Sequence, residues 1–318
     1  MGKKKRLVSV LFAMAAILLN VYLIVAVQSH WRVRLVLCVA VDAMAAICVR
    51  NVETLLRVPF EIFKDRGMFV TLVKNDFQAR FAGSYLGLFW AYVQPLITIL
   101  LYWFVFQVGL RSGNVSDHPF ILFLVSGLVP WFYFSECWSG ASGVLLEYNY
   151  LVKKVVFNVS FLPAMKVCSA LFVHLFFVAI IMVMSLAYGY GFHPYMLQVI
   201  YYIFGMALLV LGLAYATSAF TVYFRDMSQI VGILLTIGIW VTPIMWNAET
   251  TMPGLAHVIF KLNPMYYIVD GFRDCLLNKI WFWEKPVWSI YFWCVTVVVY
   301  LLGTKLFNRL KVHFSDVL

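Results

Sequence analysis

The distribution of charged and apolar residues along the chain predicts a series of membrane-spanning helices. A helix rises about 1.5 Å per residue and the hydrocarbon core of a bilayer is about 30 Å thick, so about 20 apolar residues cross it. Eight stretches are uncharged or nearly so: residues 7–27, 35–49, 84–110, 120–146, 167–192, 194–224, 227–248 and 286–304. All but 35–49 are long enough to span, and we expect an all-α membrane protein with six spans from residue 84 onward.

A charged, amphipathic segment precedes the first of these six spans. Residues 58–80 mix Phe, Leu and Val with Lys and Arg, the composition of a helix that lies in the headgroup plane. The chain then turns at Gly83, and residues 84–110 follow without a charge. We therefore expect an interfacial helix that leads into a transmembrane helix.

The composition excludes a water-soluble domain and indicates the orientation of the chain. Of 318 residues, 64% are hydrophobic and 12% are charged, whereas a soluble domain carries about 25% charged residues. With residues 58–80 placed in the cytoplasm, 17 of the 24 Lys and Arg fall on that side. This asymmetry follows the positive-inside rule, so the net charge of +10 indicates orientation rather than nucleic-acid binding.

The N-terminal 57 residues are expected to form a hydrophobic extension of a main domain at 58–318. Residues 7–27 follow a basic cluster as a signal sequence does, but the run is long for one and no clear cleavage site follows. If this run is retained as a span, only residues 35–49 could return the chain, although they carry Asp42 and leave Arg32 and Arg34 outside. The alternative is an over-called start codon, with Met44 or Met68 as the first residue.

The chain lacks the motifs of common catalytic chemistry. It contains no G-x-x-x-x-G-K-[ST] phosphate loop, so energy from ATP must come from a separate subunit. It also has no G-x-S-x-G motif and no metal-type cluster of His, Asp and Glu, and its six Cys lie mostly in apolar runs, where we expect them to pack. We therefore expect a non-catalytic chain that binds no cofactor or metal itself.

Five motifs, in order and at compatible spacing, resemble the membrane subunit of type-2 ATP-binding-cassette polysaccharide exporters. They are Gly83, Ser84, Leu86, Gly87, Trp90 and Pro95; Gly127, Leu128, Pro130, Trp131 and Phe134; Trp240, Thr242, Pro243 and Ile244; Leu262, Asn263 and Pro264; and Gly271, Arg273 and Asp274. The resemblance covers residues 60–318 and implies six helices, an N-terminal interface helix and short re-entrant helices that gate the outer mouth. The N-terminal extension departs from this pattern.

The resemblance also implies partners for the chain. The permease of this family acts as a homodimer with two ATPase subunits, which bind ATP and magnesium, and a cytoplasmic coupling helix docks in each ATPase. Residues 147–166 correspond to that helix, although Phe157-Asn158 replaces the usual Phe-Pro step. The alternative is an ordinary basic loop. The coupling candidates are Tyr150, Lys153, Lys154, Phe157 and Phe161.

Aromatic residues make up 18% of the chain and suggest a path for sugar rings. Flat apolar faces permit sliding, because they hold a ring without fixed charges; the alternative for each residue is an interfacial belt. The candidates for the glycan path, on the first and fifth spans, are Trp90, Tyr92, Tyr102, Trp103, Phe106, Trp240 and Trp246. Those for the outer gate are Asn263, Pro264, Tyr266, Tyr267, Arg273 and Asp274. Pro243 is expected to break or bend the fifth span.

Glu136 stands near the middle of the second span. An ionised acid at that depth costs about 2.5–3.5 kcal/mol on insertion scales, so we expect it to face a wet cavity or a partner. A proton relay is the alternative, but no acid or His recurs at a similar depth in the six expected helices.

These observations predict the transmembrane subunit of an ATP-driven exporter in a bacterial inner membrane. Its cargo would be a lipid-linked or lipid-anchored polysaccharide, and the sequence leaves open whether this is capsule, O-antigen or teichoic acid. One alternative is a drug or lipid exporter of the same superfamily. Another is a membrane-embedded glycosyl- or acyltransferase, which needs a recurring acid or His at the membrane face.

Overall fold

The described chain is almost entirely helical. The computed structural model describes residues 2–25, 30–80, 85–111, 113, 115, 117–153, 157–252 and 254–317. Six helices in these ranges are long and apolar enough to cross a membrane: Arg6–Val25, Trp90–Gly109, Phe120–Ser142, Phe161–Ala187, Pro194–Tyr223 and Pro286–His313. The only β structure among the described residues is an isolated bridge between Val115 and His118.

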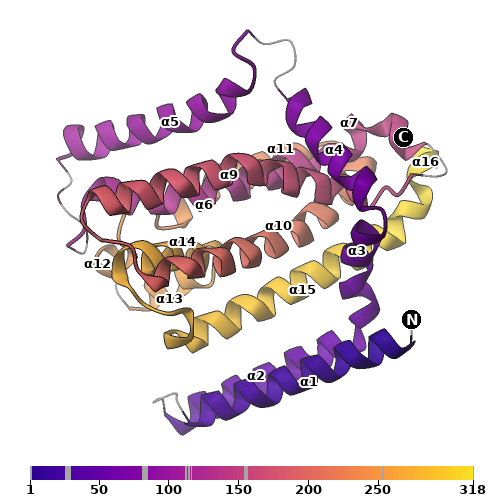
Figure 1. Ribbon diagram of the computed structural model, residues 1–318, viewed down its shortest axis with the longest axis horizontal. Coiled ribbons are helices and arrows are strands. Elements are labelled where there is room, and N and C mark those ends of the chain that lie inside the picture. Colours follow the sequence, from indigo (N-terminus) through magenta and orange to yellow (C-terminus); the bar gives the residue numbers. More distant parts are fainter. Residues whose placement is uncertain are drawn as a thin grey trace.

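Four long helices form the central bundle (Figure 1): α6 (Phe120–Ser142), α9 (Phe161–Ala187), α10 (Gln198–Tyr223) and α15 (Pro286–Leu310). α6 is the most enclosed of them. α10 and α15 cross in backbone contact, since a Cβ at Gly303 would lie 2.0 Å from the carbonyl oxygen of Gly212. Small residues permit such close packing in a bilayer, where lipid tails are as apolar as the side chains.

Two helices lie at the margin of this bundle with most of their residues exposed. α5 (Trp90–Trp103) continues into the π-helical turn η2 (Phe104–Gly109) and contacts α6. α11 (Met227–Val241) ends before the predicted fifth span does, because Thr242 is extended. The residue before a proline avoids the helical region, so Pro243 ends the helix rather than bending it.

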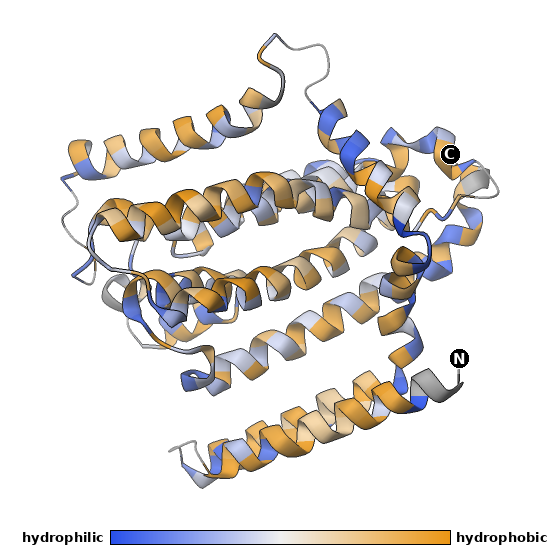
Figure 2. Cartoon of the chain, viewed as in Figure 1, coloured by the Kyte–Doolittle hydropathy of each residue, from blue (hydrophilic) through white to orange (hydrophobic). Residues whose placement is uncertain are grey.

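Short helices and hydrophilic residues gather at the end of the bundle that carries the C-terminus (Figures 1 and 2). The positive-inside rule assigns this end to the cytoplasm. The predicted interfacial segment forms two helices, α3 (Val52–Lys64) and α4 (Arg66–Ala79), separated at Asp65. The other elements at this end are α7 (Val144–Glu147), α8 (Asn149–Val152), η6 (Lys311–His313) and α16 (Phe314–Val317).

The opposite end carries the connection between α11 and α15. It contains α12 (Ala248–Thr251), α13 (Leu255–Lys261), α14 (Pro264–Arg273), the π-helical turn η4 (Asp274–Asn278) and η5 (Phe282–Glu284), beside η3 (Pro194–Leu197) of the α9–α10 turn. α14 is largely buried and packs on α6 and α10. That these helices gate the outer mouth stays a prediction.

The N-terminal residues form a helical hairpin beside α15, at the edge of the molecule away from α5 (Figure 1). It consists of α1 (Gly2–Val25) and α2 (Trp31–Arg50), which meets α3 at a bend of 61°. Asp42, which the sequence leaves without a partner, accepts a hydrogen bond of 2.8 Å from Asn20 of α1. α3 runs across residue 57, and the predicted domain boundary there stays a prediction.

Candidate functional site

A groove of about 470 Å³ lies between α5 and the bundle. One wall carries Trp90, Gln94 and Thr98, which recur every four residues and so share one face of α5. The other wall carries Ser135, Glu136 and Ser139 of α6, together with Phe132, Val173 of α9 and Leu235 of α11. The groove therefore combines an aromatic ring on each wall, several neutral polar groups and a single carboxylate.

Glu136 joins this groove to a buried group of charges centred on Arg80. Nη1 of Arg80, at the end of α4, donates to Oε1 of Glu136. Nη2 of Arg80 lies 3.2 Å from Oδ2 of Asp76 and 2.5 Å from Oγ of Ser169 on α9. One guanidinium thus ties the interfacial helix to two helices of the bundle.

Lys166 extends the same group of charges to the cytoplasmic surface. Its ammonium lies 2.7 Å from Oδ1 of Asp76 and 2.9 Å from Oε2 of Glu147, the last residue of α7. Tyr148 donates a further hydrogen bond of 3.1 Å to Asp76. We call Asp76, Arg80, Glu136, Glu147 and Lys166 the ionic cluster.

The carboxyl of Asp76 is the most deeply buried charge of the ionic cluster, with a side chain 1% exposed. Burial raises its pKa, but hydrogen bonds from Lys166 and Ser169 and the charges of Lys166 and Arg80 outweigh this effect. The pKa of Asp76 therefore lies below its usual value, and the group stays ionised.

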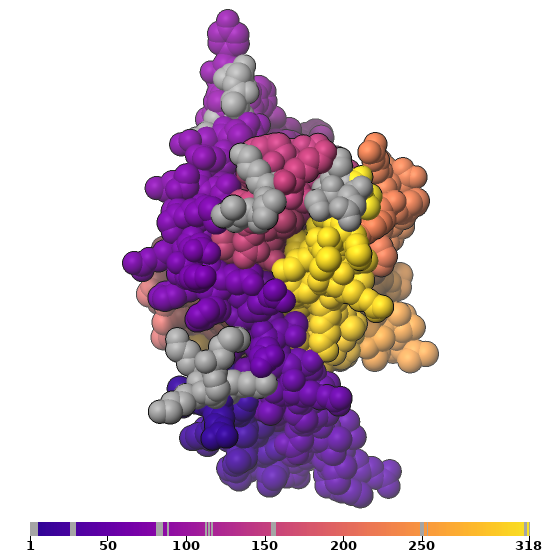
Figure 3. All heavy atoms as spheres, turned by 90° about the vertical axis from the view of Figure 1, so that its right-hand side faces the viewer, coloured from indigo at the N-terminus to yellow at the C-terminus, as the bar shows by residue number. Residues whose placement is uncertain are grey.

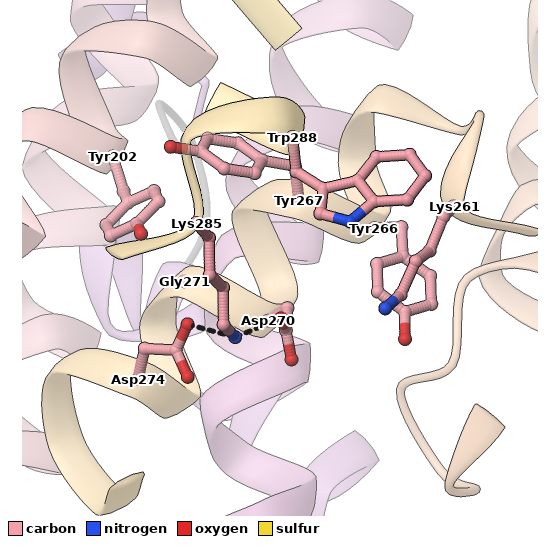
Figure 4. Close-up of a pocket in the computed structure, with 9 residues that line it drawn as sticks. All are labelled: Tyr202, Lys261, Tyr266, Tyr267, Asp270, Gly271, Asp274, Lys285 and Trp288. Carbon is pink, nitrogen blue, oxygen red and sulfur yellow. Dashed lines mark hydrogen bonds and ion pairs between the residues drawn. The ribbon is translucent and has the colours of Figure 1, made fainter. Parts of the chain in front are cut away.

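A second charged site lies in the outer segment between α13 and α15 (Figure 4). The ammonium of Lys285 bridges Asp270 and Asp274 at 2.7 and 2.5 Å. Lys261 lies across a small cavity, over the rings of Tyr266 and Trp288 at 5.8 and 5.4 Å from their centroids. Burial, with the adjacent Asp270, raises the pKa of Asp274 to about 6.

Several of the predicted gate residues anchor this outer segment to the bundle. Asn263 caps α14 by accepting from the amide of Met265 at 3.0 Å and donates to Thr242, at the end of α11, at 2.8 Å. Pro264 is the first residue of α14. The hydroxyl of Tyr267 lies 2.8 Å from Oγ of Ser289 on α15.

Arg273 is a second, deeper anchor and is only 6% exposed. Its Nη2 donates to the carbonyl oxygens of Ile244 and Phe123 at 2.9 and 3.4 Å, and its guanidinium lies 3.5 Å from the centroid of the Phe123 ring. Gly127 of α6 leaves room for this guanidinium, because a Cβ there would lie 3.2 Å from Nη2. Gly127, Ile244 and Arg273 belong to three of the five sequence motifs, which thus meet at one contact.

Comparison with known proteins decides the family. Residues 68–277, from α4 to η4, match the model of the ABC-2 type transporter. The chain belongs to the ABC-2 type transporter family. This confirms the type-2 family recognised from the five motifs, and the six apolar helices agree with a multi-pass protein of the bacterial inner membrane.

Curated relatives of this ABC-2 transporter chain are export permeases. The O-antigen export system permease protein RfbA of Myxococcus xanthus is 27% identical over 265 residues, which is 82% of this chain and 99% of the relative. A protein of the same name from Klebsiella pneumoniae is 25% identical over 258 residues, 79% of this chain and 95% of the relative. Family membership also implies an ATPase partner for the ABC-2 chain.

The candidate glycan-path residues of the ABC-2 chain lie in several environments. Trp90 lines the groove, whereas the ring of Tyr92 packs 4.3 Å from that of Phe176 on α9. Trp240 is exposed on α11, and Trp246 donates to its carbonyl at 3.2 Å. The remaining three are half-buried against the bundle: Tyr102, Trp103 and Phe106. Within one chain, only Trp90 of the seven reaches the groove.

The coupling candidates of the ABC-2 chain divide into surface and core residues. Seen from the cytoplasmic end, the segment around α7 and α8 lies between α4 and the C-terminal tail (Figure 3). Tyr150 is 55% exposed and Lys153 is also exposed, whereas Phe157 is half-buried and Phe161 is 0% exposed, 5.7 Å from the ring of Phe69. Lys154, like Gly83 and Ser84 of the first motif, lies outside the described residues.

The sequence analysis identified Glu136 but missed its partners. Its statement that no His recurs at a similar depth was wrong, because the buried ring of His174 on α9 stacks at 4.7 Å on Tyr133, which precedes Glu136 by three residues. Asp76 and Arg80 stand four residues apart in the interfacial segment, a spacing that places both on one face of a helix. This spacing could have predicted the Asp76–Arg80 pair. The segment contains several other basic residues, so the spacing alone does not single out Arg80 as the partner of Glu136. The sequence also contains the signal for a polar face on α5, because Gln94 and Thr98 follow Trp90 at intervals of four residues.

Proposed function

We propose that this chain is the transmembrane subunit of an exporter that moves a lipid-linked or lipid-anchored polysaccharide outward across the inner membrane. The cargo class follows the names of the relatives, which are O-antigen export permeases. The observation that carries the proposal is the groove between α5 and α6, with Trp90 on one wall and Ser135 and Ser139 on the other.

The chemistry of the groove suits a neutral or weakly charged sugar polymer. The flat face of Trp90 offers a platform for a sugar ring, and the amide and hydroxyl groups of Gln94, Thr98 and the serines can exchange hydrogen bonds with its hydroxyls. The one carboxylate, Glu136, is engaged by Arg80. Weak, repeated contacts without an unpaired charge allow a polymer to advance.

A homodimer is part of the proposal because the groove is open on one side. Gln94 and Glu136 would otherwise face hydrocarbon, where polar groups are costly. α5 and α11 flank the groove and expose apolar side chains, among them Leu100, Leu101, Ile233 and Ile237. A second copy against these two helices would cover the polar residues and enclose a conduit.

The drive for transport would come from the ATPase, and the chain itself would be non-catalytic and hold no cofactor. Tyr150 and Lys153 are exposed where an ATPase can touch them. The ionic cluster runs from Glu147, beside this surface, through Lys166 and Arg80 to Glu136 in the groove. Closure of the ATPases would press on α7 and α8, and the cluster would pass the displacement to α4, α6 and α9.

Deletion of the gene followed by localisation of the glycan tests the proposal. We expect finished polymer to accumulate in the cytoplasm and to return to the surface when the gene is supplied in trans. Loss of synthesis or an altered linkage would favour a membrane-embedded glycosyl- or acyltransferase. Unchanged surface glycan with altered drug or lipid export would favour the other members of the superfamily.

A further inference from the structure

A second, apolar cavity lies on the far edge of the bundle from the groove. It measures about 420 Å³ and separates the N-terminal hairpin from α10 and α15. Its walls are alkyl and aromatic side chains, including Phe12, Ala16 and Met44 of the hairpin, Phe204 of α10, and Trp293 and Val297 of α15. The hairpin precedes the residues that match the family, so this cavity lies partly outside the family domain.

The cavity belongs to the cytoplasmic half of the hairpin. In the outer half, the hairpin packs directly on α15, where Leu37 and Ile290 belong to one apolar cluster and Tyr22 donates to the carbonyl of Trp283 at 3.0 Å. Toward the cytoplasm the cavity reaches Leu55 and other residues of α3, at the membrane surface. It therefore runs from the middle of the bilayer to the inner headgroup region.

Hydrocarbon is the one substance at that depth that fits such a space. Apolar cavities stay dry but accept apolar guests, and these helices are surrounded by lipid chains. Thr296 and Tyr300 contribute to the wall, and their hydroxyl groups are buried without a hydrogen-bond partner among the described residues.

Basic residues mark the cytoplasmic mouth of the cavity. Arg6 of α1, Arg50 of α2 and Arg57 of α3 are exposed at this end. Glu61 pairs with Arg57 at 3.0 Å and also accepts a hydrogen bond of 2.8 Å from Asn158. Glu53 lies in the first turn of the same helix. Arginine side chains next to an apolar site favour a lipid that carries negative charge.

We propose that this cavity binds one acyl chain of an anionic phospholipid from the cytoplasmic leaflet, with its phosphate near Arg50 and Arg57. The bound chain fills the space where the hairpin diverges from α15 and so holds the hairpin against the bundle. The site is independent of the transported substrate.

Photolabelling of the full-length protein in lipid bilayers tests this site. The protein is reconstituted into vesicles of phosphatidylethanolamine and phosphatidylglycerol, with a trace of either lipid carrying a diazirine on one acyl chain. After illumination, labelled peptides are mapped by mass spectrometry. We expect the phosphatidylglycerol probe to label peptides around Met44 and Trp293 several-fold more than the phosphatidylethanolamine probe does.

Cavity-filling and charge variants separate specific binding from general contact with lipid. Ala16→Trp should abolish labelling at Trp293. Leu18→Trp should leave this labelling intact, because the side chain of Leu18 on the same helix is 68% exposed. Arg50→Gln with Arg57→Gln, which leave the cavity wall unchanged, should remove the preference for phosphatidylglycerol, and Lys64→Gln should not. Equal labelling by both probes, or labelling that survives Ala16→Trp in protein of unchanged elution volume, would overturn the proposal.

Discussion

The side chain of Arg80 links α4 to α6 and α9, and its removal should lower the stability of the folded protein. Arg80→Ala leaves Glu136 without its cation and leaves Lys166 as the only cation paired with Asp76. Removing one partner of a buried pair costs about 3–5 kcal/mol, and we expect a loss near the lower end of that range because Glu136 is partly exposed. The melting temperature of the detergent-purified protein measures the effect.

Arg57→Ala is the matched control for this prediction. The side chain of Arg57 is 47% exposed, and an ion pair open to water contributes about 0–1 kcal/mol. After the substitution Glu61 keeps the hydrogen bond from Asn158. Equal shifts of the melting temperature in the two variants would show that the ionic cluster contributes no more than a surface pair.

The lowered pKa of Asp76 predicts how stability depends on pH. Because the folded state binds this proton more weakly than the unfolded chain, the contribution of Asp76 is present above the usual carboxyl pKa of about 4 and is lost as pH falls below it. The melting temperature should therefore decline more steeply between pH 5 and about pH 3 in the wild type than in Asp76→Asn. Parallel curves for the two proteins would contradict the cluster's electrostatics.

At this scale the sequence predicted single residues better than their partners. A lone acid in an apolar run identifies Glu136 without any structure, because few acids are tolerated there. Arg80 and Lys166 cannot be assigned to it in the same way, since they are two of many basic residues near the membrane surface. Aromatic residues on α5 were also predicted as a group, but helical rotation turns Tyr92 toward α9 and Trp90 toward the groove.

Among the elements, α7 and α8 offer the most direct test of ATPase docking. Lys153→Glu reverses an exposed charge at the end of α8, and we expect it to reduce both the recovery of the ATPase on affinity purification and the export of glycan. Lys305→Glu makes the same change on the exposed cytoplasmic end of α15 and should have little effect.

Phe161 gives a second contrast within the coupling candidates. Because its side chain is fully buried, Phe161→Ala should lower stability by about 3–5 kcal/mol rather than weaken docking alone. For the Lys153→Glu experiment described above, normal recovery of the ATPase and normal export would show that α7 and α8 are not the coupling segment.

The long elements followed from the sequence because hydrophobic length is set by the bilayer. α6 and α10 lie within the uncharged runs 120–146 and 194–224, whereas α9 begins before its run and α15 continues past the end of its run. α11 was predicted too long, since composition shows no end at Val241 while the extended Thr242 before Pro243 imposes one. The sequence left the hairpin undecided because Asp42 stands in an apolar run. Its hydrogen bond with Asn20 depends on how α1 and α2 pair.

The chain does not by itself enclose the polar groove between α5 and α6. α5 and α11 are exposed on the side where the groove opens, and the proposed function places a second copy there. Native mass spectrometry of the purified permease should accordingly detect two copies of the chain. A mass of one copy, in protein that still exports glycan after reconstitution with its ATPase, would contradict the dimeric conduit.

The claim on which the proposed function rests is that the groove between α5 and α6 is the path of the glycan, and photocrosslinking in exporting cells tests it most directly. A photoreactive amino acid is placed at Gln94, in the groove, or at Leu175, on the exposed face of α9. We predict glycan adducts at Gln94 and none at Leu175. Adducts at both positions, or none at Gln94 while export continues, would contradict it.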